Sequence, residues 1–197
     1  MYLIFDTETT GVPKNNWKDW RECHLIQIGW IIVDKQFNII SSKSFIVKNG
    51  GRFNSTKESL DVHHITDQFR EENGITFKEA IQHFISDCDK CNGIVCHGAL
   101  FDVGLLVKES IIYNIDLSIL SDMNVFDTKL SEHYTGGKMN LSNTVKSISP
   151  NFSVDIGEIE EHDALYDSYL CLELFKKSDS KIQMIRKFRY FLENFGK

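Results

Sequence analysis

Acidic side chains near the N-terminus have the types and the spacing that metal or acid/base chemistry needs. Asp6 and Glu8 lie two residues apart at the end of an apolar run, residues 2–6. Side chains two apart on a strand point to the same side, so both carboxylates can reach one point in space. Two converging anions repel each other unless a cation neutralises them or one is protonated. The pair therefore indicates a hard-metal site or an acid/base dyad, with a solvated strand end as the alternative.

Two later segments supply further acids. Asp102 opens a helical pattern just after a predicted strand at 93–96, and ligands gather outside strand ends in such sheets. The alternative is an acid that complements the helix dipole. Near the C-terminal end, Asp163 and Asp167 follow His162 and lie four residues apart, so they could share one helix face. Spacing alone does not decide which of the two is a ligand.

The hydrophobic pattern predicts the elements that must position these acids. Residues 2–6, 25–33 and 37–47 are apolar, β-branched runs typical of a three-stranded β-meander. A polar, Gly/Asn-rich connection follows over 48–59, and further strands are expected at 93–96 and 124–126. Apolar residues recur with helical spacing in the segments 76–90, with Thr76 as N-cap, 101–112, 163–176 and 180–195. Antiparallel strands that lead into alternating strands and helices predict a mixed α/β sheet with helices packed against it.

The composition indicates one globular domain. The chain has 197 residues, 42% of them hydrophobic and 25% charged, with only two prolines. No run approaches the roughly 18 apolar residues of a membrane-spanning helix, and acids interrupt the N-terminus where a signal peptide needs its apolar core, so no membrane partner is expected. The net charge of −6 argues against a protein that coats nucleic acid through a basic field, but not against one that grips a single end. Five scattered cysteines favour a reducing, cytoplasmic compartment.

Taken together, the three acidic segments resemble a known family. The order D-x-E at the end of the first strand, H-x-A-x-F-D in mid-chain and H-x-A-x-x-D near the C-terminal end resembles the DEDDh branch of the DnaQ-like 3′-to-5′ exonuclease superfamily, which includes proofreading domains of the polymerase III epsilon type. The resemblance covers about residues 2–176 and is supported by the DTETTG run at 6–11, Gln27-Ile28-Gly29, the segment 64–66 and the segment 126–128. It implies an RNase H-like fold, a five-stranded mixed sheet flanked by helices, in a single exonuclease domain over residues 1–197.

The resemblance also implies roles for individual residues. Asp6, Glu8, Asp102 and Asp167 are expected to hold two Mg²⁺ or Mn²⁺ ions, and His162 is expected to act as the general base. Two ions ~3.5–4 Å apart can supply a nucleophile at neutral pH and neutralise the charge that grows during phosphodiester hydrolysis. Hard oxygen ligands suit such ions better than they suit zinc. The implied reaction removes nucleoside 5′-monophosphates from the 3′ ends of single-stranded nucleic acid, with DNA favoured and RNA kept as a second substrate.

Substrate contacts are implied for five further residues. By resemblance, Thr7, Thr9 and Thr10 would lie near the terminal nucleotide, while Val12 and Ile65 would pack against the last bases. Apolar contacts with bases tolerate any sequence, as an end-trimming enzyme requires. An ordinary core position is the alternative for Ile65.

One position departs from the family pattern. Family members commonly have Asn directly after the histidine of the second motif, whereas Gly98 follows His97 in this chain. We expect the change to tune activity or substrate fit rather than to abolish catalysis, because all five residues assigned to chemistry are present. The resemblance allows a polymerase-type protein or a second copy of the chain, as a homodimer, for a partner. The alternative function is a noncatalytic module that binds nucleic-acid ends, or a partner-bound subunit, on the same fold.

Overall fold

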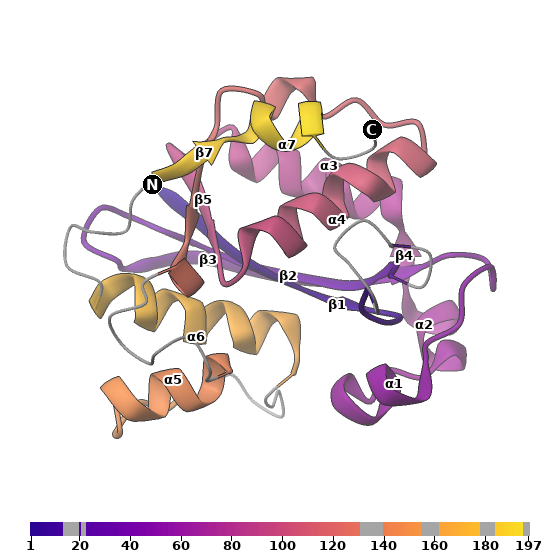
Figure 1. Ribbon diagram of the computed structural model, residues 1–197, viewed down its shortest axis with the longest axis horizontal. Coiled ribbons are helices and arrows are strands. Elements are labelled where there is room, and N and C mark those ends of the chain that lie inside the picture. Colours follow the sequence, from indigo (N-terminus) through magenta and orange to yellow (C-terminus); the bar gives the residue numbers. More distant parts are fainter. Residues whose placement is uncertain (14–19, 21–22, 131–139, 155–161, 178–183, 195–197) are drawn as a thin grey trace.

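A mixed sheet is the centre of the computed structural model, which describes residues 1–13, 20, 23–130, 140–154, 162–177 and 184–194 (Figure 1). Its seven strands follow the order β4-β3-β2-β1-β5-β6-β7. In chain order they are β1 (Tyr2–Thr9), β2 (Leu25–Val33), β3 (Ile39–Lys48), β4 (Ile75–Thr76), β5 (Gly93–Cys96), β6 (Asn124–Asp127) and β7 (Met184–Lys187). β2 is antiparallel to both β1 and β3, β5 is parallel to β1 and β6, and β7 is antiparallel to β6.

Helices cover both faces of this sheet (Figure 1). One face carries α3 (Phe77–Cys88), α4 (Ala99–Ile112) and α7 (Phe188–Asn194), and the other carries α5 (Leu141–Ile148) and α6 (Ala164–Lys177). Two short helices, α1 (Lys57–His63) and α2 (Asp67–Asn73), lie at the end of the sheet where β1 stops (Figure 1). The 3₁₀ turns η1 (Ser118–Leu120) and η2 (Thr128–Leu130) flank β6. None of the helices in the described ranges has the length and apolar character needed to cross a membrane.

Side-chain alternation along β1 separates two hydrophobic cores. Leu3 and Phe5 pack on the side of α3 and α4, whereas Ile4 packs on the side of α6. Successive side chains on a strand point to opposite faces, so Asp6 and Glu8 continue the series of Ile4 and face α6. The end of β1 therefore presents both acids to the start of that helix.

The predicted fold class is confirmed, and several elements have the predicted positions. Strands 25–33 and 93–96 have the predicted bounds. Thr76 caps α3 as predicted, and Glu79 completes a capping box with it. The predicted number of five strands is wrong, because the two-residue β4 and the four-residue β7 extend the sheet at its two edges.

The prediction of a helix over 180–195 is wrong for residues 184–187. Residues 184–187 form β7, and the helix occupies only 188–194, while 180–183 and 195 lie outside the described residues. Pairing with the free edge of β6 satisfies backbone groups there and outweighs the local helical pattern. Two helices fall in or next to the segment predicted as a polar connection. Thr56 and Thr66 are their N-caps, each accepting a hydrogen bond from a backbone amide three residues on.

Candidate active site

Three carboxylates from two distant segments converge at the end of β1. Asp6, Glu8 and Asp167 each offer an oxygen atom, and these atoms lie within 4.8 Å of one another. Asp6 and Glu8 come from β1, and Asp167 comes from the first turn of α6. The structure thus brings together three of the four acids that the sequence analysis assigned to metal ions.

Asp102 approaches the same region from the first turn of α4 on the other side of the sheet. Its side chain is buried, and its Oδ1 accepts a hydrogen bond of 2.7 Å from the Thr7 hydroxyl. Thr7 lies between Asp6 and Glu8 on β1, so its side chain points to the opposite face. Asp102 is therefore tied to the strand that carries the other acids, although it lies outside the group of three.

Burial and mutual repulsion make this cluster unfavourable for negative charge. Burial, and then the charges of Asp102, Asp167 and Glu8, raise the pKa of Asp6 well above its ordinary value. Burial, and then Asp167 and Asp102, raise the pKa of Glu8 to about 9. Burial raises the pKa of Asp102 to about 7 against the opposing hydrogen bond from Thr7. Hard cations favour oxygen ligands and neutralise such repulsion, so the donor set fits Mg²⁺ or Mn²⁺.

The alternative acid in the last motif has a different position. Asp163 precedes α6, and its Oδ1 accepts a 2.8 Å hydrogen bond from the backbone amide of Leu165. Its Oδ2 accepts a 2.6 Å hydrogen bond from the Gln27 side chain on β2. Asp163 therefore caps the helix, and Asp167, one turn later, joins Asp6 and Glu8.

His162 lies directly before this cap. Its side chain is exposed, and its backbone has a φ of 67°, in the left-handed region. The preceding residues, 155–161, lie outside the described part of the chain. The role of His162 as general base stays a prediction.

The three threonines expected near substrate make internal hydrogen bonds. Thr7 holds Asp102, and the Thr9 hydroxyl donates to the carbonyl of Gly11 at 2.8 Å. Thr10 accepts at its hydroxyl from the backbone amide of His24 at 3.0 Å. These hydroxyls brace the end of β1, and their contact with substrate stays a prediction.

The two apolar candidates have more open positions. Val12 is 63% exposed just beyond the end of β1. Ile65 is half-buried in the turn between α1 and α2. Both lie in segments that follow or pack against the end of β1, and their contact with bases stays a prediction.

The segment that contains Ile65 is fastened to β1. The backbone amide of Thr56 donates to the carbonyl of Thr10 at 2.7 Å, and the Ser59 hydroxyl donates to the carbonyl of Thr9. His63 is buried at the end of α1, where burial, and then the charge of His64, lower its pKa to about 4. The sequence pattern alone gave no sign that α1 binds the end of β1.

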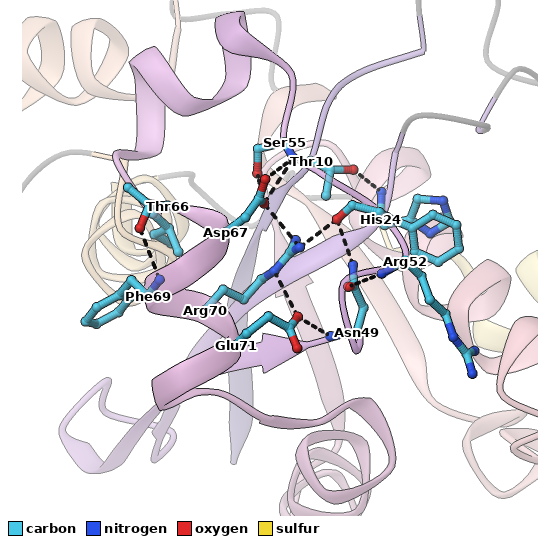
Figure 2. Close-up of polar contacts among 12 residues, drawn as sticks. Thr10, His24, Asn49, Arg52, Ser55, Thr66, Asp67, Phe69, Arg70 and Glu71 are labelled. Atoms are coloured by element: carbon cyan, nitrogen blue, oxygen red, sulfur yellow. Dashed lines mark hydrogen bonds and ion pairs between the residues drawn. The ribbon is translucent and has the colours of Figure 1, made fainter.

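A buried arginine stabilises the segment between β3 and β4, which contains α1 and α2 (Figure 2). Arg70, only 1% exposed, donates from Nη2 to the Phe53 carbonyl at 2.6 Å and forms an ion pair of 3.1 Å with Asp67. Asp67 also accepts from the backbone amide of Ser55. Glu71 accepts hydrogen bonds from two backbone amides of the loop that follows β3. These contacts hold the loop and α2 together beside the end of β1.

The structure gives a physical reason for glycine at position 98. Gly98 has a φ of +114°, which residues with a side chain rarely adopt. It occupies the N-cap position of α4 without a side chain to cap the helix, and Asp127 on β6 takes that role. The Asp127 carboxylate accepts from the backbone amides of Gly98 at 2.8 Å and Ala99 at 2.9 Å. Asp127 therefore fixes the helix start that carries Asp102, a function that the 126–128 motif did not by itself reveal.

Comparison with protein families gives one match over most of the chain. A family model described as "Exonuclease" (RNase_T) matches residues 3–175. DNA polymerase III subunit epsilon of Buchnera aphidicola subsp. Acyrthosiphon pisum (strain APS) is 29% identical over 175 residues, covering 88% of this chain and 70% of the relative. The subunit of the same name from Buchnera aphidicola subsp. Baizongia pistaciae (strain Bp) is 28% identical over 196 residues, with coverages of 94% and 74%.

Solved structures share the fold. Exonuclease X, in complex with 5′ overhanging duplex DNA, is similar with a TM-score of 0.69 and 20% identity, covering 96% of this chain and 99% of that chain. The nuclease domain of 3′hExo, a DEDDh family member bound to rAMP, has a TM-score of 0.69 and 12% identity, with coverages of 94% and 96%. The comparisons confirm the family resemblance and the RNase H-like fold class predicted from the sequence.

Proposed function

We propose, because this chain belongs to the exonuclease family whose model it matches over residues 3–175, that it is a metal-dependent 3′–5′ exonuclease acting on single-stranded nucleic acid. The products are nucleoside 5′-monophosphates. The observation that supports this most directly is the convergence of Asp6, Glu8 and Asp167 within 4.8 Å, with the buried Asp102 beside them. The whole chain, residues 1–197, acts as a single exonuclease domain.

The four acids would hold two divalent ions, Mg²⁺ or Mn²⁺. When bound, the ions activate water and neutralise the charge that grows on the phosphoryl and leaving oxygens. Thr7 keeps the Asp102 carboxylate in one orientation through its hydrogen bond. The burial that raises the pKa of Asp6 and Glu8 also strengthens their attraction for a cation, because charges interact more strongly away from bulk water.

His162 would take the proton released by the attacking water. Imidazole is the side chain best suited to exchange a proton near neutral pH. His162 is exposed directly before α6, so its ring would be able to pass the proton to solvent. The internally bonded Thr9 and Thr10 would contribute to substrate binding by bracing the strand end, while Val12 and Ile65 would contact the last bases.

DNA is the favoured substrate. The similar curated proteins are epsilon subunits of DNA polymerase III, and exonuclease X was solved with duplex DNA that has 5′ overhangs. RNA is the second substrate to test, because 3′hExo was solved with rAMP. A polymerase-type protein, or a second copy of the chain, would be the partner, and the cytoplasm would be the compartment.

The test is nucleotide release from matched, 5′-labelled single-stranded DNA and RNA with Mg²⁺, Mn²⁺ or EDTA. The wild type should give a ladder of products one nucleotide apart that requires metal. Asp167→Ala should abolish the ladder, whereas Asp116→Ala, which removes an exposed carboxylate that accepts a hydrogen bond from the backbone amide of Ser118, should retain it.

Two results would count against this function. Equal cleavage by wild type and Asp167→Ala would assign the activity to a contaminant. Binding of the oligonucleotides without cleavage by the wild type would favour the noncatalytic end-binding module.

A further inference from the structure

We propose that Gln27 is a positioning residue that seats the start of α6 and thereby holds Asp167 beside Asp6 and Glu8. This inference rests on the proposed exonuclease function. Gln27 is one of the few polar residues that are almost fully buried in the sheet, at 3% exposure. It lies on β2, a strand that carries none of the predicted metal ligands.

Strand register places Gln27 next to the acids. In the antiparallel pairing of β1 with β2, Glu8 lies opposite Gln27 and Asp6 lies opposite Gly29. Residues directly opposite each other in such a pair have side chains on the same face. Gln27 and Gly29 therefore lie on the face covered by α6, in line with both acids.

Every polar atom of the Gln27 side chain has a partner. Its Nε2 donates to Asp163 Oδ2 at 2.6 Å and to the Ser44 hydroxyl at 3.1 Å. Its Oε1 accepts from the backbone amide of Ala164 at 3.1 Å. Asp163 in turn accepts from the amide of Leu165 at 2.8 Å. One amide side chain thus binds both the helix cap and the first backbone amide of α6.

Gly29 lets the helix approach closely enough for these bonds. A Cβ atom at Gly29 would lie 2.3 Å from the backbone nitrogen of Leu165, closer than real atoms approach. The Ser168 hydroxyl donates to the Gly29 carbonyl at 3.0 Å, which fastens the next turn of α6 to the same strand. The Asp167 amide donates to the Asp163 carbonyl at 2.9 Å, so a single helical turn connects Asp163, which Gln27 binds, to the predicted metal ligand Asp167.

The chemistry of an amide explains why glutamine suits this position. It donates to the Asp163 carboxylate while it accepts from a backbone amide, and it adds no charge to a region where Asp163 already contributes to the raised pKa of Glu8. A carboxylate at position 27 would face that of Asp163 without a proton between them. A buried polar group that loses its hydrogen-bond partner lowers the free energy of unfolding by more than the hydrogen bond itself contributed.

The test is a donor–acceptor exchange between positions 27 and 163. Gln27→Glu places two carboxylates against each other, and Asp163→Asn places two amide donors against each other. In the double variant Gln27→Glu/Asp163→Asn, the new amide at position 163 donates to the new carboxylate at position 27, and the total charge of the pair is unchanged. Gln36→Glu, at an exposed position in the β2–β3 turn at the far end of the sheet, is the matched control for the added charge.

Two readouts separate positioning from general stability. Turnover is measured as kcat and KM at saturating Mn²⁺, below the unfolding temperature of every variant, and Mn²⁺ affinity is measured by calorimetry on protein without nucleic acid. Each single variant should lose roughly 10–100-fold in kcat and in Mn²⁺ affinity, as expected when a group that orients a ligand is lost. KM should change little, the double variant should recover most of both losses, and Gln36→Glu should behave like the wild type.

Single variants with wild-type kcat and Mn²⁺ affinity would overturn the proposal, and so would a double variant no better than either single one. If the wild type released no nucleotide, the proposed function would fail, but the calorimetric comparison would still decide the role of Gln27. Unchanged Mn²⁺ affinity in both single variants would then refute it.

Discussion

Gly29→Ala should slow turnover strongly, because its methyl group would meet backbone rather than a movable side chain. Its Cβ would lie 2.3 Å from Leu165 N and 2.5 Å from Ala164 C, whereas ordinary contact begins at 3.4 Å. The start of α6 must therefore retreat by about 1 Å, and Asp167 moves with it. A misplacement of that size costs roughly 100-fold in rate. The overpacking should lower the free energy of unfolding by about 1–3 kcal/mol.

The assay is release of mononucleotides from 5′-labelled DNA at saturating metal, with urea unfolding measured on the same preparations. Gly51→Ala is the matched control, because Gly51 has a φ of +71° and open space around its Cβ position. Alanine there costs about 1–2 kcal/mol of backbone strain without moving α6. Equal turnover by Gly29→Ala and Gly51→Ala, with both variants folded, would show that the close approach of α6 to Gly29 does not position Asp167.

Two further predictions concern stability. Asp87 accepts from Lys43 at 2.7 Å and Lys90 at 2.6 Å, and although burial raises its pKa, these contacts prevail and lower it to about 2. Since folding lowers this pKa, the stabilisation is complete above the unfolded value of ~3.9 and is lost as the pH falls toward 2. The free energy of unfolding, measured with urea, should therefore fall more steeply over this pH range in the wild type than in Asp87→Asn. Parallel pH dependences in the two proteins would contradict the role given to the Asp87 carboxylate. Arg70→Met should lower the free energy of unfolding by about 3 kcal/mol, which is the low end for a broken buried ion pair, because the carboxylate partners of Arg70 keep partial contact with water. Arg189→Met, which breaks an exposed ion pair, should lower it by less than ~1 kcal/mol. Equal losses in the two variants would refute the distinction between the buried and the exposed pair.

Chemistry made the acids of the site predictable from the sequence. Strand alternation determines that Asp6 and Glu8 share a face, whatever the rest of the fold does. The choice between Asp163 and Asp167 depended on the family resemblance, because both lie at helical spacing. The cap formed by Asp163 explains the ambiguity: an acid at a helix start has a structural use that the sequence does not distinguish from a ligand.

Positions determined by long-range pairing were beyond prediction. The Gln27-Ile28-Gly29 segment is recognisable as a motif, but the function of Gln27 follows from the β1–β2 register and from the approach of a helix more than 130 residues later. β7 shows the same limit, since its strand conformation depends on the free edge of β6 rather than on its own pattern. Local periodicity carries no information about either partner.

Mutual repulsion explains why the helix starts need such supports. The acids come from β1, α4 and α6, and the charges of Asp102 and Asp167 raise the pKa of both acids on β1, so repulsion opposes the approach of the two helix starts to the end of that strand. Each helix start is instead bound by a side chain from a strand: Asp127 on β6 binds α4, and Gln27 on β2 binds α6. Because these bonds lie outside the group of converging carboxylates, they can keep the ligands in place before a cation arrives. Affinity for the metal should therefore depend on residues that never touch it.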